Sequence, residues 1–216
     1  MASNPGNWQP LAADIEMPHV LVAGRIHASG VALLKSASGF SCDLVDEVST
    51  ESYVRLIGKA DALLLRTQPL TAEILAKAPL LKIVSRHGVG YDAVDVPALN
   101  ARHIPLAIVG DVNSRSVAEH TLMLMLSVAR RVVANDAASR TGNWNERNSF
   151  SSVELDGKQL LLFGFGRIGK AVAKLAQAFG MRVAAHDPNV PEEAMAAAGI
   201  QYIGDARDGL KEADFL

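Results

Sequence analysis

Short apolar runs alternate with segments of helical periodicity along the first half of the chain. The runs are rich in Val, Ile and Leu and are bounded by Gly, Pro or charged residues, a pattern typical of buried strands. They occupy residues 19–24, 40–45, 61–66, 81–85 and 104–109, and the helical segments occupy 30–36, 50–58, 71–78 and 96–102. Strands that alternate with helices predict an α/β fold with a doubly wound parallel sheet, here a complete domain of flavodoxin-like size.

The second half repeats this alternation after a long helical segment. Residues 116–135 are predicted as one helix about 30 Å long, which begins at an S-x-x-E capping box formed by Ser116 and Glu119. Apolar residues surround most of its circumference, which predicts a buried helix. Residues 140–150 are predicted as an ordered loop. Strands follow at 159–163, 182–186 and 201–203, helices at 167–179 and 191–198, a turn or short helix at 209–211, and the start of a fourth strand at 213–216.

Three glycines in G-x-G-x-x-G spacing connect the strand at 159–163 to the helix that follows it. Gly164 permits a tight turn after the strand, Gly166 leaves the backbone bare for a pyrophosphate, and Gly169 lets the helix pack close to the strand. The N-terminus of the helix adds unpaired N–H groups and a partial positive charge. This context predicts a dinucleotide-binding site, and a glycine turn without a ligand is the alternative.

An acidic residue at the end of the next strand extends this prediction. Asp187 follows the last glycine of the motif by 18 residues, near the spacing of roughly 20 that is typical of a ribose-binding carboxylate. Such a carboxylate accepts hydrogen bonds from the ribose hydroxyls and repels a 2′-phosphate. We therefore expect NAD rather than NADP as the cofactor, and a solvated aspartate with no ligand is the alternative.

Composition narrows the class of protein. The 216 residues carry a formal net charge of −2, which gives no indication of binding to nucleic acid or to an anionic membrane surface. With Cys42 as its one cysteine the chain forms no internal disulfide, which fits a reducing, cytoplasmic compartment. We expect no signal peptide, because the N-terminus lacks a basic start and an apolar core, and no membrane span, because the apolar runs are too short. Residues 1–18 are predicted as a flexible arm.

Several motifs in one order resemble the D-isomer-specific 2-hydroxyacid dehydrogenases, a family that includes phosphoglycerate dehydrogenases and glyoxylate/hydroxypyruvate reductases. The motifs are Arg66-Thr67, GVGYDAVD at 88–95, SVAEH at 116–120, R-x-G-x-W at 140–144, and the glycine motif with its aspartate. The resemblance implies a flavodoxin-like substrate domain and an incomplete Rossmann domain that binds NAD, with a helix between them that takes part in a homodimer. The implied bounds are 19–112 for the substrate domain, 113–150 for the long helix and its loop, and 151–216 for the Rossmann part.

The resemblance also implies which residues bind ligands. The backbone N–H groups of Val89 and Gly90 would bind the carboxylate of a small 2-hydroxy or 2-oxo acid, because bare backbone donors form an anion nest. Arg66 would lie near this carboxylate. Arg167 and Ile168 would join the glycine motif in binding NAD. The alternatives are a plain tight turn and a solvated arginine at a strand end.

The chain departs from the family in its catalytic residues. The family's catalytic arginine, glutamate and histidine belong to motifs whose place would be after Leu216. His120 follows Glu119 on the long helix, but adjacent helical residues do not face each other, and His87 is more typical of an exposed loop histidine. The resemblance thus implies an NAD-dependent dehydrogenase that is truncated at its C-terminus and inactive by itself. The alternatives are a non-catalytic NAD-binding or interaction module, and a fold completed by a partner chain or by domain swapping.

Overall fold

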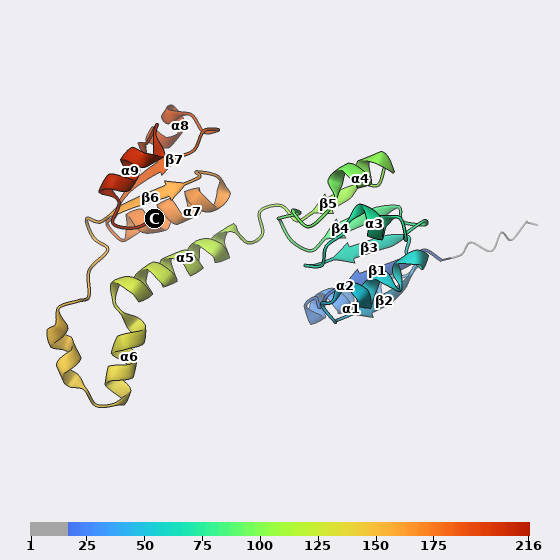
Figure 1. Cartoon of the computed structure of the whole chain (residues 1–216), viewed down its shortest axis with the longest axis horizontal. Helices are drawn as coiled ribbons and strands as arrows, with labels where there is room; N and C mark the ends of the chain where they lie inside the picture. The colour runs from blue at the N-terminus through green and yellow to red at the C-terminus, as the bar shows by residue number, and fades with distance from the viewer. Residues whose placement is uncertain (1–16) are drawn as a thin grey trace, which may run out of the picture. The chain divides into compact units, whose positions relative to one another are not determined.

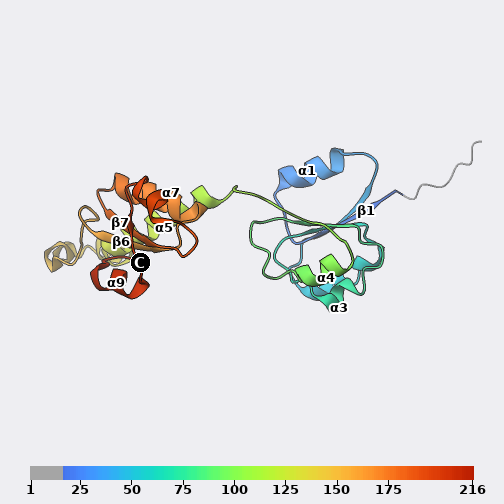
Figure 2. The same cartoon turned by 90° about the horizontal axis from the view of Figure 1, so that it is seen from above.

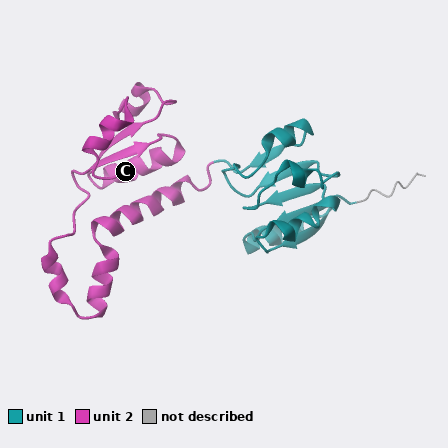
Figure 3. Cartoon of the chain, in the orientation of Figure 1, with its two compact units in different colours: residues 1–110 teal, residues 111–216 magenta. Residues whose placement is uncertain are grey.

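The computed structural model describes residues 17–216, so the arm predicted at 1–18 lies almost entirely outside the described residues. The chain divides into two compact units, unit 1 at Met1–Gly110 and unit 2 at Asp111–Leu216 (Figure 3). The division falls at the end of the flavodoxin-like segment, where Gly110 and Asp111 follow its last strand.

Unit 1 is a parallel five-stranded sheet with the order β2-β1-β3-β4-β5 (Figure 1). Figure 2 shows α1 on one face of the sheet and α3 and α4 on the other, which confirms the doubly wound, flavodoxin-like prediction. The strands are β1 (His19–Ala23), β2 (Ser41–Val45), β3 (Ala62–Leu65), β4 (Ile83–Arg86) and β5 (Leu106–Ile108). The helices are α1 (Ala28–Ser36), α2 (Thr50–Val54), the 3-10 turn η1 (Ile57–Lys59), α3 (Ala72–Leu75) and α4 (Val96–Ala101).

Side-chain caps determine where the helices of unit 1 begin. The Ser49 hydroxyl accepts from the N–H of Ser52 at 3.2 Å, and the Thr71 hydroxyl accepts from the N–H of Ile74 at 3.4 Å. Each cap satisfies one of the N–H groups that a helix start leaves without an intrahelical partner. The predicted helix at 50–58 ends earlier than expected, because its last turn tightens into η1.

The core of unit 1 lies between the sheet and its helices. The central strands contribute Leu21, Leu63 and Val84, which are essentially inaccessible to solvent. Leu21 pairs with Leu63, and Leu63 pairs with Val84, in adjacent strands. Tyr53 of α2 is equally buried and donates its hydroxyl to the Pro69 carbonyl. A tyrosine is tolerated here because this hydrogen bond satisfies its polar end.

We expect the stability of unit 1 to fall at alkaline pH because of Tyr53. Burial raises the pKa of its hydroxyl to about 12, against about 10 in an unfolded chain. Between these values the unfolded state loses a proton that the folded state keeps, so this contribution is complete below about pH 10 and is lost as the pH rises to about 12, an effect of about 2–3 kcal/mol. Urea unfolding across this range tests the expectation. Tyr53→Phe should remove this part of the pH dependence, and identical slopes for the two proteins would contradict it.

Unit 2 begins with α5 (Ser114–Ala129), followed by α6 (Val132–Arg140) and the 3-10 helix η2 (Trp144–Ser149). The prediction of one helix over 116–135 is therefore wrong, and the region predicted as a loop contains η2. At 1.5 Å per residue α5 spans about 24 Å rather than about 30 Å. The chain breaks at Arg131, whose φ of 49° lies in the left-handed region.

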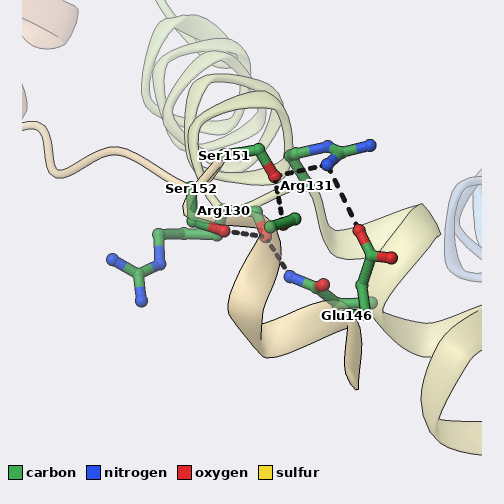
Figure 4. Close-up of polar contacts among 7 residues, drawn as sticks. Arg130, Arg131, Glu146, Ser151 and Ser152 are labelled. Carbon is green, nitrogen blue, oxygen red and sulfur yellow. Dashed lines mark hydrogen bonds and ion pairs between the residues drawn. The ribbon is translucent and has the colours of Figure 1, made fainter. Parts of the chain in front are cut away.

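Polar contacts hold this break in place (Figure 4). The guanidinium of Arg131 donates through Nη1 to Glu146 at 3.3 Å and to the Ser151 hydroxyl. The carbonyl of Arg130 accepts from the Asn135 side chain at 2.7 Å, so the last turn of α5 is capped by a residue of α6. The break thus depends on side chains that lie up to 20 residues further along the chain.

The start and the surface of α5 also differ from the predictions. Asn113 precedes the helix, and Glu119 accepts from Arg115 at 2.8 Å instead of closing a capping box with Ser116. One face of α5 is buried against α7, but Leu124 and Val128 are 51% and 73% exposed. Within this chain the helix is therefore amphipathic rather than buried all round.

Unit 2 continues as a parallel three-stranded sheet with the order β6-β7-β8. Figure 2 shows α7 on one face of this sheet and α9 on the other. The strand predicted at 213–216 begins as an isolated parallel bridge between Phe215 and Leu160, and Leu161 donates its N–H to the Phe215 carbonyl at 2.9 Å. The elements are β6 (Gln159–Phe163), α7 (Arg167–Ala178), β7 (Arg182–His186), α8 (Glu192–Ala196), β8 (Gln201–Tyr202) and α9 (Ala206–Glu212).

Candidate functional site

The glycine turn connects β6 to α7 with the geometry that an anion site needs. Gly164 has a φ of +99°, which L side chains rarely adopt, and its N–H donates to the His186 carbonyl at 2.8 Å. Gly166 is the N-cap residue of α7 and offers no side chain to the free N–H groups. The turn therefore leaves the end of the sheet and presents the start of a helix directly to solvent.

The other two glycines have opposite surroundings. A Cβ on Gly166 would meet nothing within 4 Å, so the space above this residue is open to a ligand. A Cβ on Gly169 would overlap the carbonyl oxygen of Gly164 and would lie 3.2 Å from the carbonyl carbon of Gly164. Gly169 thus lets α7 approach the turn, while Gly166 lets a ligand approach the backbone.

The first turn of α7 supplies the donors. The N–H of Lys170 bonds to the Gly166 carbonyl at 2.9 Å, so the N–H groups of Arg167, Ile168 and Gly169 lie ahead of the first intrahelical bond. Such groups carry the positive end of the helix dipole. The side chains of Arg167 and Ile168 are exposed, and the N–H groups of residues 167–169 have no acceptor among the described residues.

Asp187 lies beside this turn at the end of β7. Its Oδ2 accepts from the N–H of Phe165 at 2.8 Å, and its Oδ1 accepts from the N–H of Asn189 at 2.8 Å. These backbone donors, Phe165 first, hold the pKa of the Asp187 carboxyl below its usual value. The carboxylate is therefore ionised at neutral pH and is tied to the glycine turn, a contact that the spacing of the motif did not predict.

In unit 1 the candidate residues gather at the carboxyl edge of the sheet. The N–H of Arg66 donates to the Ala23 carbonyl at 3.0 Å, and the N–H of His87 donates to the Leu65 carbonyl at 2.8 Å. The N–H of Val109 donates to the Gly88 carbonyl at 3.3 Å. The loops after β1, β3, β4 and β5 thus lie side by side at the edge where open α/β sheets bind ligands.

Two arginines and a bare stretch of backbone share this edge. Arg66 is exposed and donates through Nη1 to the Arg25 carbonyl at 2.9 Å, and Arg86 donates through Nη1 to the His87 carbonyl at 2.8 Å. Among the described residues, no acceptor takes up the N–H groups of Val89 and Gly90. The loop therefore offers two backbone donors next to positive charge. Arg86 is a residue that sequence reasoning missed, although its position at a strand end is a signal.

Gln68, two residues after Arg66, is a buried polar residue that was not selected as a site residue from the sequence. Its side chain is 2% exposed, with Oε1 accepting from the N–H of Thr67 at 3.1 Å and Nε2 donating to the Glu47 carbonyl at 3.4 Å. Gly24 packs directly against it. A Cβ on Gly24 would lie 2.9 Å from both the Arg66 Cβ and the Gln68 Oε1, so a glycine at the end of β1 permits the close packing of these loops.

Gly24→Ala should destabilise unit 1 more than Gly39→Ala. Both glycines have a φ near +90°, at +94° and +92°, so alanine is strained by about 1–2 kcal/mol at either position. Only at Gly24 does the methyl group meet Arg66 and Gln68, which adds about 1–3 kcal/mol of overpacking. Urea unfolding of the two variants measures this difference in the free energy of unfolding. Equal losses of stability would contradict the prediction and would show that Gln68 can move to make room for the methyl group.

Among the described residues, neither His87 nor His120 has a carboxylate partner. His87 and His120 are both exposed, and Glu119 pairs with Arg115 rather than with His120. In the described part of the chain, no set of three or more His, Cys, Asp or Glu residues is arranged to hold a metal ion. Within residues 17–216, no helix has both the length and the apolar character required to cross a bilayer.

Comparison with known families agrees with this geometry. The family model described as the D-isomer specific 2-hydroxyacid dehydrogenase, catalytic domain, matches residues 20–214. The chain belongs to this family. The D-3-phosphoglycerate dehydrogenase of Mycobacterium tuberculosis is 40% identical over 203 residues, and that of Methanocaldococcus jannaschii is 34% identical over 201 residues. These matches cover 94% and 93% of this chain but 38% of each relative, so this family member spans about two fifths of their length.

Solved structures of the family show the same fold. A D-lactate dehydrogenase from Aquifex aeolicus, complexed with NAD and lactic acid, has a TM-score of 0.76 at 26% identity, covering 91% of this chain and 58% of that one. An NADPH-dependent glyoxylate/hydroxypyruvate reductase from Sinorhizobium meliloti also has a TM-score of 0.76, at 28% identity, covering 91% and 61%. The two names show that neighbours of this family member use different nicotinamide cofactors.

Proposed function

We propose that this chain carries the adenosine side of the NAD site and the substrate-carboxylate site of a D-2-hydroxyacid dehydrogenase. The reaction is hydride transfer between NAD(H) and a 2-hydroxy or 2-oxo acid. The observation that carries the proposal is the open backbone at Gly166, next to the free N–H groups of α7 and to the carboxylate of Asp187. A side chain at residue 166 would fill the space that a pyrophosphate needs.

The residues of unit 2 fit NAD. Gly164, Gly166 and Gly169 shape the turn, and the N–H groups of Arg167 and Ile168 donate to the pyrophosphate. The Asp187 carboxylate accepts from the adenosine ribose hydroxyls and repels a 2′-phosphate, which favours NAD over NADP. When bound, the nicotinamide gives or accepts the hydride.

The residues of unit 1 fit the acid substrate. The N–H groups of Val89 and Gly90 would donate to the substrate carboxylate, because backbone donors without a partner bind anions. Arg66 and Arg86 lie at the same edge and add positive charge. The proposed substrate is accordingly a small 2-hydroxy or 2-oxo acid, held by its carboxylate.

The proposal extends to a homodimer. A groove of about 590 Å³ lies on unit 2 between α5 and α7, with apolar residues along most of its length, namely Leu122, Met123, Leu126, Leu175 and Phe179. We propose that a second copy of the chain covers this groove and the exposed side of α5 next to it.

The net charge of −2 and the single cysteine favour a cytoplasmic protein without a nucleic-acid or membrane partner.

Calorimetric titration with NAD tests the proposal. The wild-type chain should bind, and Gly166→Asp should lower the affinity at least about thirtyfold, because a carboxylate then occupies the anion site. Gly110→Asp is the matched control, since a Cβ there also meets nothing within 4 Å and the added charge is the same. Equal affinities for the wild-type chain and Gly166→Asp would refute the proposed site.

A second candidate is a non-catalytic NAD-binding or interaction module on the same fold. Exposed apolar side chains favour it, because Val128, Trp144 and Phe150 are 73%, 70% and 91% accessible in unit 2. We expect the 216-residue chain to bind NAD but to oxidise no NADH with glyoxylate or hydroxypyruvate. Turnover that survives purification and disappears in Gly166→Asp would exclude the non-catalytic candidate.

A further inference from the structure

We propose that Asp187 is a positioning residue for the anion site formed by the glycine turn at 164–169 and the first N–H groups of α7. This role is in addition to the ribose-binding role that the proposed function gives it. Its carboxylate fixes the peptide between the first two glycines of the turn. This inference rests on the proposed function for the identity of the ligand, but the contact itself belongs to the protein alone. Asp187 would thereby prepare the pyrophosphate half of the site before any ribose is bound.

The hydrogen bonds tie the turn to β7 at two consecutive residues. Gly164 donates its N–H to the His186 carbonyl, and Phe165 donates its N–H to Asp187 Oδ2, each at 2.8 Å. The second oxygen, Oδ1, accepts from Asn189 at 2.8 Å, so the carboxylate is itself oriented by the backbone. The first bond continues the pairing of the turn with β7, and the second depends on the side-chain oxygen of residue 187.

The turn has few other restraints. Gly164 and Gly166 have no side chains, and a Cβ on either would meet nothing within 4 Å. Glycines lose more conformational freedom on folding than other residues, so the backbone between them needs an external anchor. The ring of Phe165 is buried in the core of unit 2 and anchors the turn from that side. The Lys170 ammonium lies 5.7 Å from the ring centroid. The carboxylate of Asp187 anchors the turn from the strand side.

An anchored turn binds an anion more tightly than a loose one, because less freedom is lost on binding. A residue that only contacts ribose has no such effect on a ligand without ribose. Removing its negative charge would instead favour any anion nearby. Inorganic pyrophosphate resembles the pyrophosphate linker of NAD and contains no sugar. For Asp187→Ala, the positioning role therefore predicts a lower affinity for pyrophosphate, whereas the ribose-binding role alone predicts a higher one.

Pyrophosphate binding to Asp187→Ala and Asp187→Asn separates the roles. Both variants lose the same charge, but asparagine keeps an oxygen that accepts from the N–H of Phe165. We expect Asp187→Ala to bind pyrophosphate up to about tenfold more weakly than Asp187→Asn, the cost of losing one neutral hydrogen bond. Equal affinities for the two variants would overturn the positioning role. If the wild-type chain bound neither NAD nor pyrophosphate, the proposed function would fail, and the measurement without ligand described next would decide the inference.

Amide hydrogen exchange at Phe165 tests the contact without a ligand. Exchange should be about tenfold faster in Asp187→Ala than in Asp187→Asn. The amide of Leu161, which bonds to the Phe215 carbonyl, reports whether the sheet is folded and should stay protected in both. In the wild-type chain, the Phe165 amide resonance should shift as the Asp187 carboxyl is protonated. Unchanged exchange in Asp187→Ala, or a resonance that ignores this titration, would contradict the inference.

Discussion

Replacing Phe165 with alanine is expected to lower the free energy of unfolding of unit 2 by about 4 kcal/mol, as for other large aromatic residues removed from a core. The ring is 1% exposed and packs in the core between the sheet and α7. Because Phe165 lies between Gly164 and Gly166, the cavity would also loosen the turn. We therefore expect NAD affinity to fall even in the fraction of molecules that remain folded.

Phe163→Ala is the matched control for this substitution. Phe163 lies two residues earlier, at the end of β6, and is 50% exposed. Its ring packs edge-to-face with the His186 ring, and the two ring centroids are 6.4 Å apart. Its removal should cost about 1 kcal/mol, because little buried area is lost. Urea unfolding, followed through the amide signals of β6 and β7, compares the two variants. A loss at Phe165 no larger than the loss at Phe163 would show that the ring does not anchor the turn.

The second large effect is expected from Gly169→Ala. The added Cβ would overlap the Gly164 carbonyl oxygen, and because this oxygen belongs to the backbone it cannot move without opening the turn. Overpacking of this kind costs about 3 kcal/mol. We expect α7 to move away from β6, so that unit 2 loses both stability and NAD binding.

Gly166→Ala separates stability from binding at the same turn. A Cβ at Gly166 meets nothing within 4 Å, so the free energy of unfolding should change by less than about 0.5 kcal/mol. NAD affinity should still fall, because the methyl group occupies the space proposed for the pyrophosphate. Thermal unfolding and NAD titration of both variants test the pair. Equal stability losses at residues 166 and 169 would contradict the assignment of separate roles to the two glycines.

Much of the fold follows from local patterns. The strands at 159–163 and 182–186 have the predicted bounds, since each apolar run ends at a glycine or an aspartate that leaves the sheet. Alternation of strands and helices predicts parallel pairing, and a parallel sheet restricts the topology to a few arrangements. The observed order of unit 1 is one of these, and its helices begin at the polar caps Ser49 and Thr71.

The helix predicted at 116–135 shows where local patterns are insufficient. Arg130 and Arg131 are good helix formers, so the local sequence gives no reason for the helix to end there. The end is decided by Glu146 and Ser151, which bind Arg131 from another part of the chain. The prediction of a buried helix also depends on more than the local pattern, because the apolar face that carries Val128 is exposed within this chain and does not itself indicate what would cover it.

The candidate site was predicted in part. Spacing was sufficient to select the three glycines, although only two of them have a backbone requirement within the chain itself: Gly164 has a positive φ, and Gly169 leaves no room for a Cβ. It was insufficient to predict that Asp187 accepts from Phe165, or that Gln68 joins the loops after β2 and β3. These contacts depend on the direction of side chains between loops that are distant in the sequence. Arg86 was not selected as a site residue although it stands at a strand end, because its contact with the His87 carbonyl forms only in the folded loop.

In the proposed site, the N-terminus of α7 binds the pyrophosphate of NAD. The most direct test is a titration of the isotope-labelled chain with NAD, followed through its backbone amide resonances. We expect the largest shifts at Gly166, Arg167 and Ile168 and a smaller shift at Asp187, and we expect Gly166→Asp to abolish all of them. Saturable shifts confined to other parts of the chain, or none at these residues at millimolar NAD, would contradict it.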